Sequence, residues 1–137
     1  MSSTSQALVL LSAQRSQLEG RADERELTLG WNRQVSRARE AGHLLVFVQW
    51  DGEAGTDHAT FSRAWTLYPD FHAEEGEVLV RAVHPDAFAG TDLDAELRAR
   101  GVRGLELLGL DEEALEHTAA RARDLGYAVS GAPAVVA

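Results

Sequence analysis

The sequence predicts a three-layer α/β/α sandwich around a mainly parallel sheet of five to six strands. Short apolar runs alternate with segments of helical periodicity along most of the 137 residues. Several of these runs are uninterrupted, which is typical of strands that are covered on both faces. The alternation contains no repeat and no linker-like stretch, so residues 1–137 are expected to form a single domain.

Five short segments have the composition of strands, and three longer segments show helical periodicity. The strands are predicted at residues 7–11, 44–48, 77–81, 105–108 and 127–129. The first helix is expected to end at Gly42, the second to run from an N-cap at Thr91 to Gly101, and the third to end at Gly126. The apolar faces of the first and third helices are Leu27, Trp31, Val35 and Ala38, and Leu115, Ala119, Ala122 and Leu125.

A long irregular segment, residues 51–76, separates the second and third predicted strands. A loop of this length in a compact domain is usually functional or disordered. In open parallel sheets, ligands bind beyond the carboxyl ends of the strands. The residues expected on that rim are Ser12, Trp50, 82–86 and 109–112.

Composition excludes several classes of function. The chain has no cysteine, which rules out disulfides, zinc-thiolate sites and thiol catalysis. Its net charge of -9 argues against binding to nucleic acid or to an anionic membrane. The histidines show no metal-ligand spacing, and no apolar run approaches the length of a membrane span. The expectation is a cytoplasmic protein without a metal or cofactor.

Two segments closely resemble the core of a known hydrolase family. These are Ala-Phe-Ala-Gly-Thr-Asp-Leu-Asp at residues 87–94 and Leu-Arg-Ala-Arg-Gly-Val-Arg at residues 97–103. They resemble the isochorismatase-like cysteine hydrolases, and Gln14 and Gly109 extend the likeness over about 6–129. The resemblance implies a Rossmann-like sandwich, shortened at its C-terminal edge.

The resemblance also implies that the family's catalytic triad has been lost. Ser12 stands where the family has its catalytic Asp, Ala82 where it has its Lys, and Leu115 where it has its nucleophilic Cys. All 13 basic residues are arginine, so a lysine is absent from the whole chain. Strand alternation is expected to point Arg81, the neighbour of Ala82, to the opposite face. A non-catalytic binding or partner subunit is therefore the first hypothesis.

Two alternatives remain open. In the first, an enzyme acts on small aromatic or cyclic metabolites through a remodelled site around Ser12, His84 and Asp86. In the second, the protein binds a small planar ligand without turnover. The candidate ligand-binding residues are Gln14, Trp50, Trp65, His84, Asp86, Phe88 and Glu112.

Self-association is also expected, most simply as a homodimer, with another protein partner as the alternative. A sheet that is reduced at one edge should leave apolar surface to be covered. The apolar tail at residues 134–137 has no obvious core position, so it is expected to lie in that contact.

Overall fold

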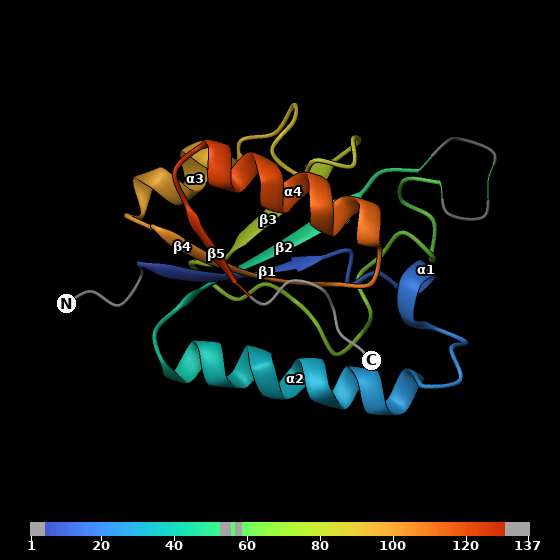
Figure 1. The fold of residues 1–137 in the computed structure, drawn as a ribbon. Coiled ribbons are helices and arrows are strands. Elements are labelled where there is room, and N and C mark those ends of the chain that lie inside the picture. The colour runs from blue at the N-terminus through green and yellow to red at the C-terminus, as the bar shows by residue number, and fades with distance from the viewer. Residues whose placement is uncertain (1–4, 53–55, 57–58, 131–137) are drawn as a thin grey trace.

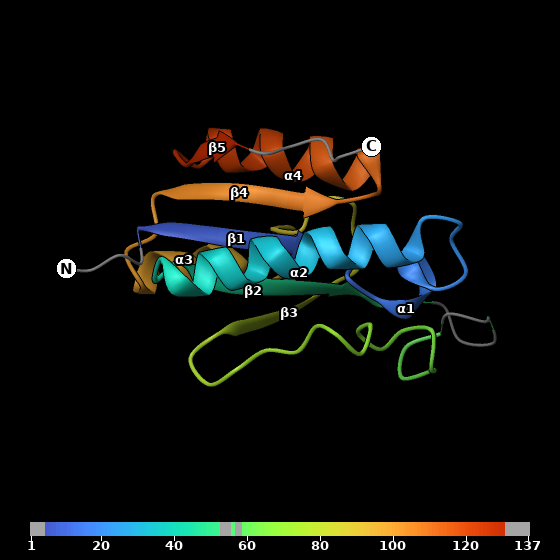
Figure 2. The same cartoon turned by 90° about the horizontal axis from the view of Figure 1, so that it is seen from below.

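The computed structural model describes residues 5–52, 56 and 59–130. Its centre is a five-stranded sheet in the order β3-β2-β1-β4-β5 (Figures 1 and 2). All four strand pairings are parallel, which confirms the predicted parallel sheet. The strands are β1 (Gln6–Leu11), β2 (Leu44–Trp50), β3 (Val78–Ala82), β4 (Gly104–Gly109) and β5 (Ala128–Ser130).

Helices cover both faces of the sheet, as the predicted sandwich requires. Helix α2 lies on one face, and α3 and α4 lie on the other (Figure 1). The helices are α1 (Arg15–Leu18), α2 (Glu24–Glu40), α3 (Leu93–Ala99) and α4 (Glu112–Asp124).

The apolar runs of the central strands are continuous because each strand serves two cores. Successive side chains of a strand point to opposite faces. In β1, Val9 and Leu11 therefore pack in the cluster beneath α3 and α4, whereas Leu8 and Leu10 pack beneath α2. The edge strand β3 alternates instead, with Val80 buried and Leu79 and Arg81 exposed, because only one of its faces is covered.

Two details of the helices differ from the prediction. The single-turn helix α1 was not expected, because a four-residue turn with one buried residue, Leu18, has no visible periodicity. At the start of α3, Asp92 rather than Thr91 occupies the N-cap position. Thr91 lies one residue earlier, and its Oγ1 accepts a hydrogen bond from the Leu93 backbone N–H at 3.2 Å. The tail at residues 134–137 lies outside the described residues, so its predicted contact stays a prediction.

A charged pair joins the end of α2 to the beginning of β3. Arg39 donates from Nε and Nη2 to the two carboxylate oxygens of Glu77, both at 2.8 Å. Burial would raise the pKa of Glu77, but the hydrogen bonds from Arg39 and from the Glu74 backbone N–H outweigh it and lower the pKa below its ordinary value of 4.5. The deprotonated carboxylate is therefore favoured in the folded state.

This pair should make the fold sensitive to acid. A carboxyl whose pKa is lowered by folding stabilises the protein above its unfolded pKa of 4.5, and this contribution is lost as the pH falls through the lower folded value. We expect Glu77→Gln to reduce the free energy of unfolding at pH 7 by about 1–2 kcal/mol and to flatten its decline in acid. Urea titrations from neutral pH to pH 3 check this, with Glu75→Gln as the exposed control. Identical pH profiles for Glu77→Gln and the wild type would contradict it.

Candidate functional site

The carboxyl ends of β1 and β2 lie side by side and border a pocket of about 250 Å³. This is the rim that the strand pattern predicted. Ser12 and Trp50 were expected on this rim, and Gln14 was a candidate ligand-binding residue. Residues 82–86 and 109–112 were also expected on the rim but do not line this pocket. The pocket is lined by Ser12, Gln14, Ser16, Gln17, Trp50, Asp51 and Gly52.

Gln14 joins three segments of the chain at this rim. Its side chain is 2% exposed, and its Oε1 accepts from the Ser12 hydroxyl at 2.9 Å and from the Trp50 backbone N–H at 2.8 Å. Its Nε2 donates to the carbonyls of Trp50 at 3.2 Å and Trp65 at 2.7 Å. Every hydrogen-bonding direction of this amide is thus used to hold β1, β2 and the long loop together.

Ser12 follows β1 directly, in a backbone conformation that is unusual for a residue with a side chain. Its φ is +65°, in the left-handed region that mainly glycine adopts. Its backbone N–H donates to the Val48 carbonyl at 2.9 Å, and its hydroxyl donates to Gln14. Ser12 is 9% exposed, so little of it faces the pocket.

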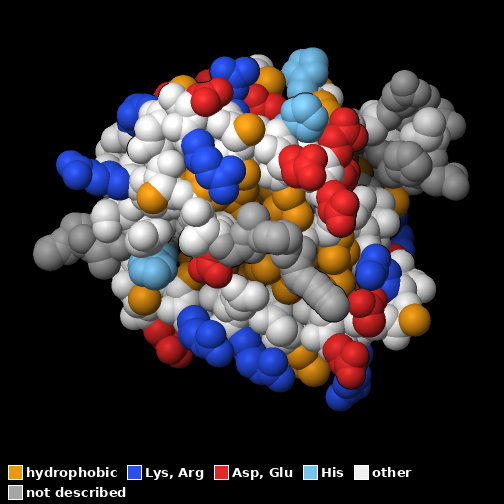
Figure 3. Space-filling model, viewed as in Figure 1, with side chains coloured by type: hydrophobic (Ala, Val, Ile, Leu, Met, Phe, Trp, Pro, Cys, Tyr) orange, Lys and Arg blue, Asp and Glu red, His pale blue; other side chains and the backbone are white. Residues whose placement is uncertain are grey.

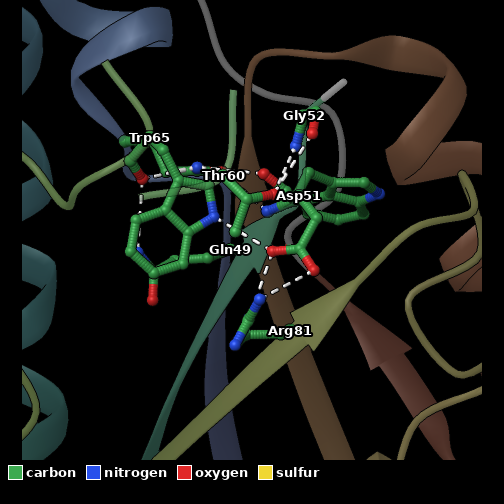
Figure 4. Close-up of polar contacts among 8 residues, drawn as sticks. Gln49, Asp51, Gly52, Thr60, Trp65 and Arg81 are labelled. Atoms are coloured by element: carbon green, nitrogen blue, oxygen red, sulfur yellow. Dashed lines mark hydrogen bonds and ion pairs between the residues drawn. The ribbon is translucent and has the colours of Figure 1, made fainter. Parts of the chain in front are cut away.

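Asp51 is the centre of a cluster that sequence reasoning missed (Figure 4). Its Oδ1 accepts from the Trp65 indole N–H at 3.0 Å and from Arg81 Nε at 3.1 Å, and its Oδ2 accepts from Arg81 Nη2 at 3.1 Å. The Arg81 guanidinium also lies 5.0 Å from the centroid of the Phe61 ring and 5.4 Å from that of Trp65. The cluster neutralises the carboxylate and ties the long loop to β3.

The positions that the resemblance assigns to Lys and Cys are filled by core side chains. Ala82 is 1% exposed and Leu115 is 3% exposed, and both belong to the apolar cluster beneath α3 and α4. A β-carbon on Gly109 would lie 3.1 Å from Leu11 Cβ and 3.7 Å from Leu115 Cδ2, so the Leu115 side chain lies beside the end of β4. As expected from strand alternation, Arg81 is on the opposite face from Ala82.

The beginning of α4 carries its own anionic cap. Asp111 occupies the N-cap, and its Oδ1 accepts from the backbone N–H groups of Glu113 at 3.0 Å and Ala114 at 3.3 Å. These are the free amides that a helix N-terminus offers to an anion. Here a side chain of the helix itself already binds them.

The three residues of the alternative site have other partners. His84 is exposed, and its carbonyl accepts from the Trp50 indole N–H at 2.7 Å. Asp86 accepts from the Phe88 backbone N–H at 2.8 Å and from Arg121 Nε at 3.0 Å. Within the part of the chain that the structure describes, no hydrogen bond joins the side chains of Ser12, His84 and Asp86.

The other candidates lie away from the lining of the pocket. Phe88 is 8% exposed and stacks on Tyr127 with ring centroids 6.0 Å apart, so it is a core residue. Glu112 is exposed in the first turn of α4. Trp65 reaches the site through its carbonyl and its bond to Asp51. In residues 5–52, 56 and 59–130, no group of three His, Asp or Glu side chains could hold a metal ion, and no helix could span a membrane.

Comparison with known proteins identifies the family. The model of the isochorismatase domain matches residues 6–133. The chain belongs to the isochorismatase family. Among curated proteins, two streptothricin hydrolases from Streptomyces noursei are each 38% identical over 96 residues. The match covers 69% of this chain but only 35% and 38% of those enzymes, so the chain spans little more than a third of their length.

Solved structures of the isochorismatase family share the fold. An isochorismatase from Pseudomonas putida superimposes with a TM-score of 0.82 at 25% identity, over 94% of this chain and 69% of that one. N-carbamoylsarcosine amidase from Thermoplasma acidophilum gives a TM-score of 0.81 at 24% identity, over 94% and 80% of the two chains. The second similarity concerns the fold alone.

Proposed function

We propose that this isochorismatase-family protein is non-catalytic and acts by binding, either to a small molecule at the rim pocket or to a protein partner. The observation that carries the proposal is the burial of Ala82 and Leu115 in one apolar cluster. The family mechanism needs a thiolate and a cation at these positions, together with a proton acceptor at the position of Ser12. The methyl group of Ala82 cannot supply the cation, and the isobutyl group of Leu115 cannot supply the thiolate.

Two further contacts support the proposal. The Ser12 hydroxyl donates to Gln14, and a serine hydroxyl does not accept a proton at neutral pH. The Asp111 carboxylate binds the amides at the start of α4, where an oxyanion would need free N–H donors. Together with the apolar side chains, these contacts leave the family reaction without a nucleophile, a base and an anion site.

The chemistry of the pocket favours a small uncharged ligand. Its lining offers the amide of Gln17, the hydroxyl of Ser16 and one aromatic residue, Trp50, whereas the Gln14 amide is already fully bonded within the protein. Its carboxylate, Asp51, is neutralised by Arg81. A planar molecule with amide or hydroxyl groups matches this combination of stacking surface and hydrogen-bonding groups.

The alternative function is hydrolysis of small aromatic or cyclic metabolites through Ser12, His84 and Asp86. The left-handed backbone at Ser12 favours it, because strained residues cluster at functional sites. This reading requires the exposed His84 side chain to turn toward Ser12. Turnover that is present in the wild type and lost in His84→Ala would support it.

We expect no hydrolysis of isochorismate, nicotinamide or streptothricin by the purified protein, because the thiolate, cation and base are all missing. Streptothricin is included because the curated relatives are named for it. Product formation is measured by chromatography against a heat-inactivated sample, with an active family enzyme as the positive control. Turnover clearly above the inactivated sample would overturn the proposal. Thermal-shift and calorimetric titrations with planar amides then test binding at the pocket.

A further inference from the structure

Strand β3 forms one edge of the sheet (Figure 2) and pairs with β2 alone. In a strand, the N–H and carbonyl of one residue point to the same side, and those of the next residue point to the other. The Ala82 carbonyl accepts from the Asp51 backbone N–H at 2.9 Å, so Ala82 and every second residue before it face β2. The N–H and carbonyl groups of Leu79 and Arg81 therefore point outward from the sheet.

These outward groups of β3 are unpaired within the described part of the chain, where no hydrogen bond reaches the backbone of Leu79 or Arg81. An unpaired strand edge is a template for another strand, and proteins usually guard it with a proline, a bulge or a projecting charge. The sequence of β3 contains no proline, and its register with β2 is continuous. Its single charge, Arg81, is held back against Asp51. The edge is thus left open.

Exposed apolar side chains gather around this edge. The described part of the chain has four large hydrophobic side chains that are exposed, and three of them lie on β3, directly after it or against its arginine. Leu79 is 53% exposed on the strand, and Val83, which follows it, is 61% exposed. Phe61 is 73% exposed, and the centroid of its ring lies 5.0 Å from the Arg81 guanidinium. Such a gathering beside an unpaired strand favours an interaction with another protein.

A groove of about 220 Å³ lies between the edge of β3 and the beginning of α3. Two of its charged residues are already paired, Arg81 with Asp51 and Glu96 with Arg100. Asp92 is exposed, and its side chain has no hydrogen bond or ion pair with the other described residues. The groove therefore offers one free carboxylate, which a basic side chain would complement. It is lined by Leu79, Val80, Arg81, Gly90, Thr91, Asp92 and Glu96.

Acidic charge is not confined to this edge. Figure 3, viewed from the side on which β5 lies, shows acidic side chains gathered over the beginning of α4. Glu112, Glu113 and Glu116 are exposed there. A net charge of -9 attracts a basic segment toward the whole molecule, so attraction alone does not select β3. The selection comes from the open backbone groups and the apolar side chains of the edge.

We propose that β3 is the docking edge for a partner protein, which adds an extended segment of alternating apolar and basic residues to the sheet. Successive side chains of the added strand point to opposite faces. Those on the face of Leu79 are apolar and cover it, and those on the face of Val80 are basic and reach Asp92 in the groove. The main-chain bonds to Leu79 and Arg81 supply affinity, and the alternating side chains supply selectivity.

This inference rests on the binding role proposed above and gives the protein partner its chemistry. The two can fail separately, because they are measured differently. Hydrolysis by the purified protein would overturn the non-catalytic role without changing the state of the β3 amides. A β3 edge that binds no peptide would overturn this inference and leave the hydrolysis assays as they are.

Amide hydrogen exchange, read by NMR, tests the open edge directly. In the protein alone, the amides of Leu79 and Arg81 should exchange about tenfold or more faster than those of Val80 and Ala82, which bond to β2. The probe is a synthetic peptide of alternating valine and lysine, about seven residues long like a typical strand. At saturation it should slow exchange at Leu79 and Arg81 about tenfold or more. A peptide of alternating valine and glutamate is the control and should give no protection.

Matched variants locate the binding site. Leu79→Pro removes an outward N–H, which an edge strand tolerates, and should weaken binding of the valine–lysine peptide about tenfold or more. Leu79→Lys should weaken it as well, whereas Leu29→Lys, at an exposed leucine of α2, should not. Asp92→Asn should weaken it about threefold, as expected of an exposed ion pair. Glu116→Gln changes the net charge equally and should bind like the wild type. Circular dichroism verifies folding, and Leu79→Lys replaces Leu79→Pro where the proline variant is unfolded.

Four results would each overturn the proposal. They are equal exchange at the outward and inward amides of β3, no protection by the valine–lysine peptide, equal protection by the valine–glutamate peptide, and unchanged binding in the folded Leu79 variants. Protection that grows with protein concentration in the absence of peptide would overturn it too, since a second copy of the chain would then occupy the edge.

Discussion

Replacing Gln14 by alanine is expected to lower the free energy of unfolding by about 3 kcal/mol or more. The substitution removes four hydrogen bonds made by a side chain that is 2% exposed. The Trp65 carbonyl keeps a second donor, the Gln49 side chain. The backbone N–H and carbonyl of Trp50 both lose the hydrogen bond that they make with Gln14. A buried polar group left without a partner costs about 1–3 kcal/mol. Chemical denaturation of the variant measures the loss.

Two control variants separate the hydrogen bonds from the change in side-chain size. Gln17→Ala removes, from the same pocket, a side chain that makes no hydrogen bond with the other described residues, so it should cost less than about 0.5 kcal/mol. Gln14→Glu keeps the size and the acceptor oxygen but loses the donor to the Trp50 and Trp65 carbonyls, so its cost should be close to that of alanine. A Gln14→Ala variant as stable as Gln17→Ala would show that Gln14 does not hold the rim together.

The elements of the fold could be read from the sequence because burial imposes a local pattern. A strand covered on both faces must be apolar at every position, and residues 44–48 meet that condition without exception. The N-cap at Asp92 and the single turn of α1 could not be read in this way. Their positions depend on loop geometry and on contacts with distant segments, such as the bond from the Arg15 backbone N–H to the Thr66 carbonyl at 2.9 Å.

The site was predictable only in part, for a related reason. The resemblance located Ser12 and Gln14, and strand alternation correctly pointed Arg81 away from Ala82. Neither reveals that Arg81 binds Asp51, since the two residues are 30 positions apart and belong to different strand ends. The sequence does indicate that Asp51 and Arg81 lie at the carboxyl ends of two strands. If these strands are neighbours in a parallel sheet, their end residues lie close together.

Asp111 shows how one residue can support two interpretations. From the sequence it is one of three acids that open a helix, which fits the helix dipole. In the structure it is the residue that binds the amides of Glu113 and Ala114. In the proposed function the same contact also keeps these amides from binding another anion. That second role rests on the resemblance to a hydrolase family and is part of the proposal.

Restoring the family's cysteine alone is expected to leave the protein inactive. In Leu115→Cys the thiol would lie in the apolar cluster that also contains Ala82, with the Asp111 carboxylate already bound to the amides of the first turn of α4. Without a nearby cation the thiol keeps a pKa of at least about 8.5, so only about 3% or less is thiolate at pH 7. The rate of alkylation by iodoacetamide as a function of pH measures that pKa, and the hydrolysis assays measure activity.

The triple variant Ser12→Asp, Ala82→Lys, Leu115→Cys tests whether the missing cation and base are the reason that Leu115→Cys is inactive. Its lysine enters a position that is 1% exposed, so we expect the triple variant to lose several kcal/mol of stability. In the folded protein the lysine should lower the pKa of the thiol introduced at position 115 below that of the single variant Leu115→Cys. Leu115→Ala controls for the space that the substitution opens in the core. Strong hydrolysis by Leu115→Cys alone would mean that other residues already supply the cation and the base. The thiol would then titrate well below its ordinary pKa without Ala82→Lys, which is the opposite of what an apolar cluster and an anionic cap should produce.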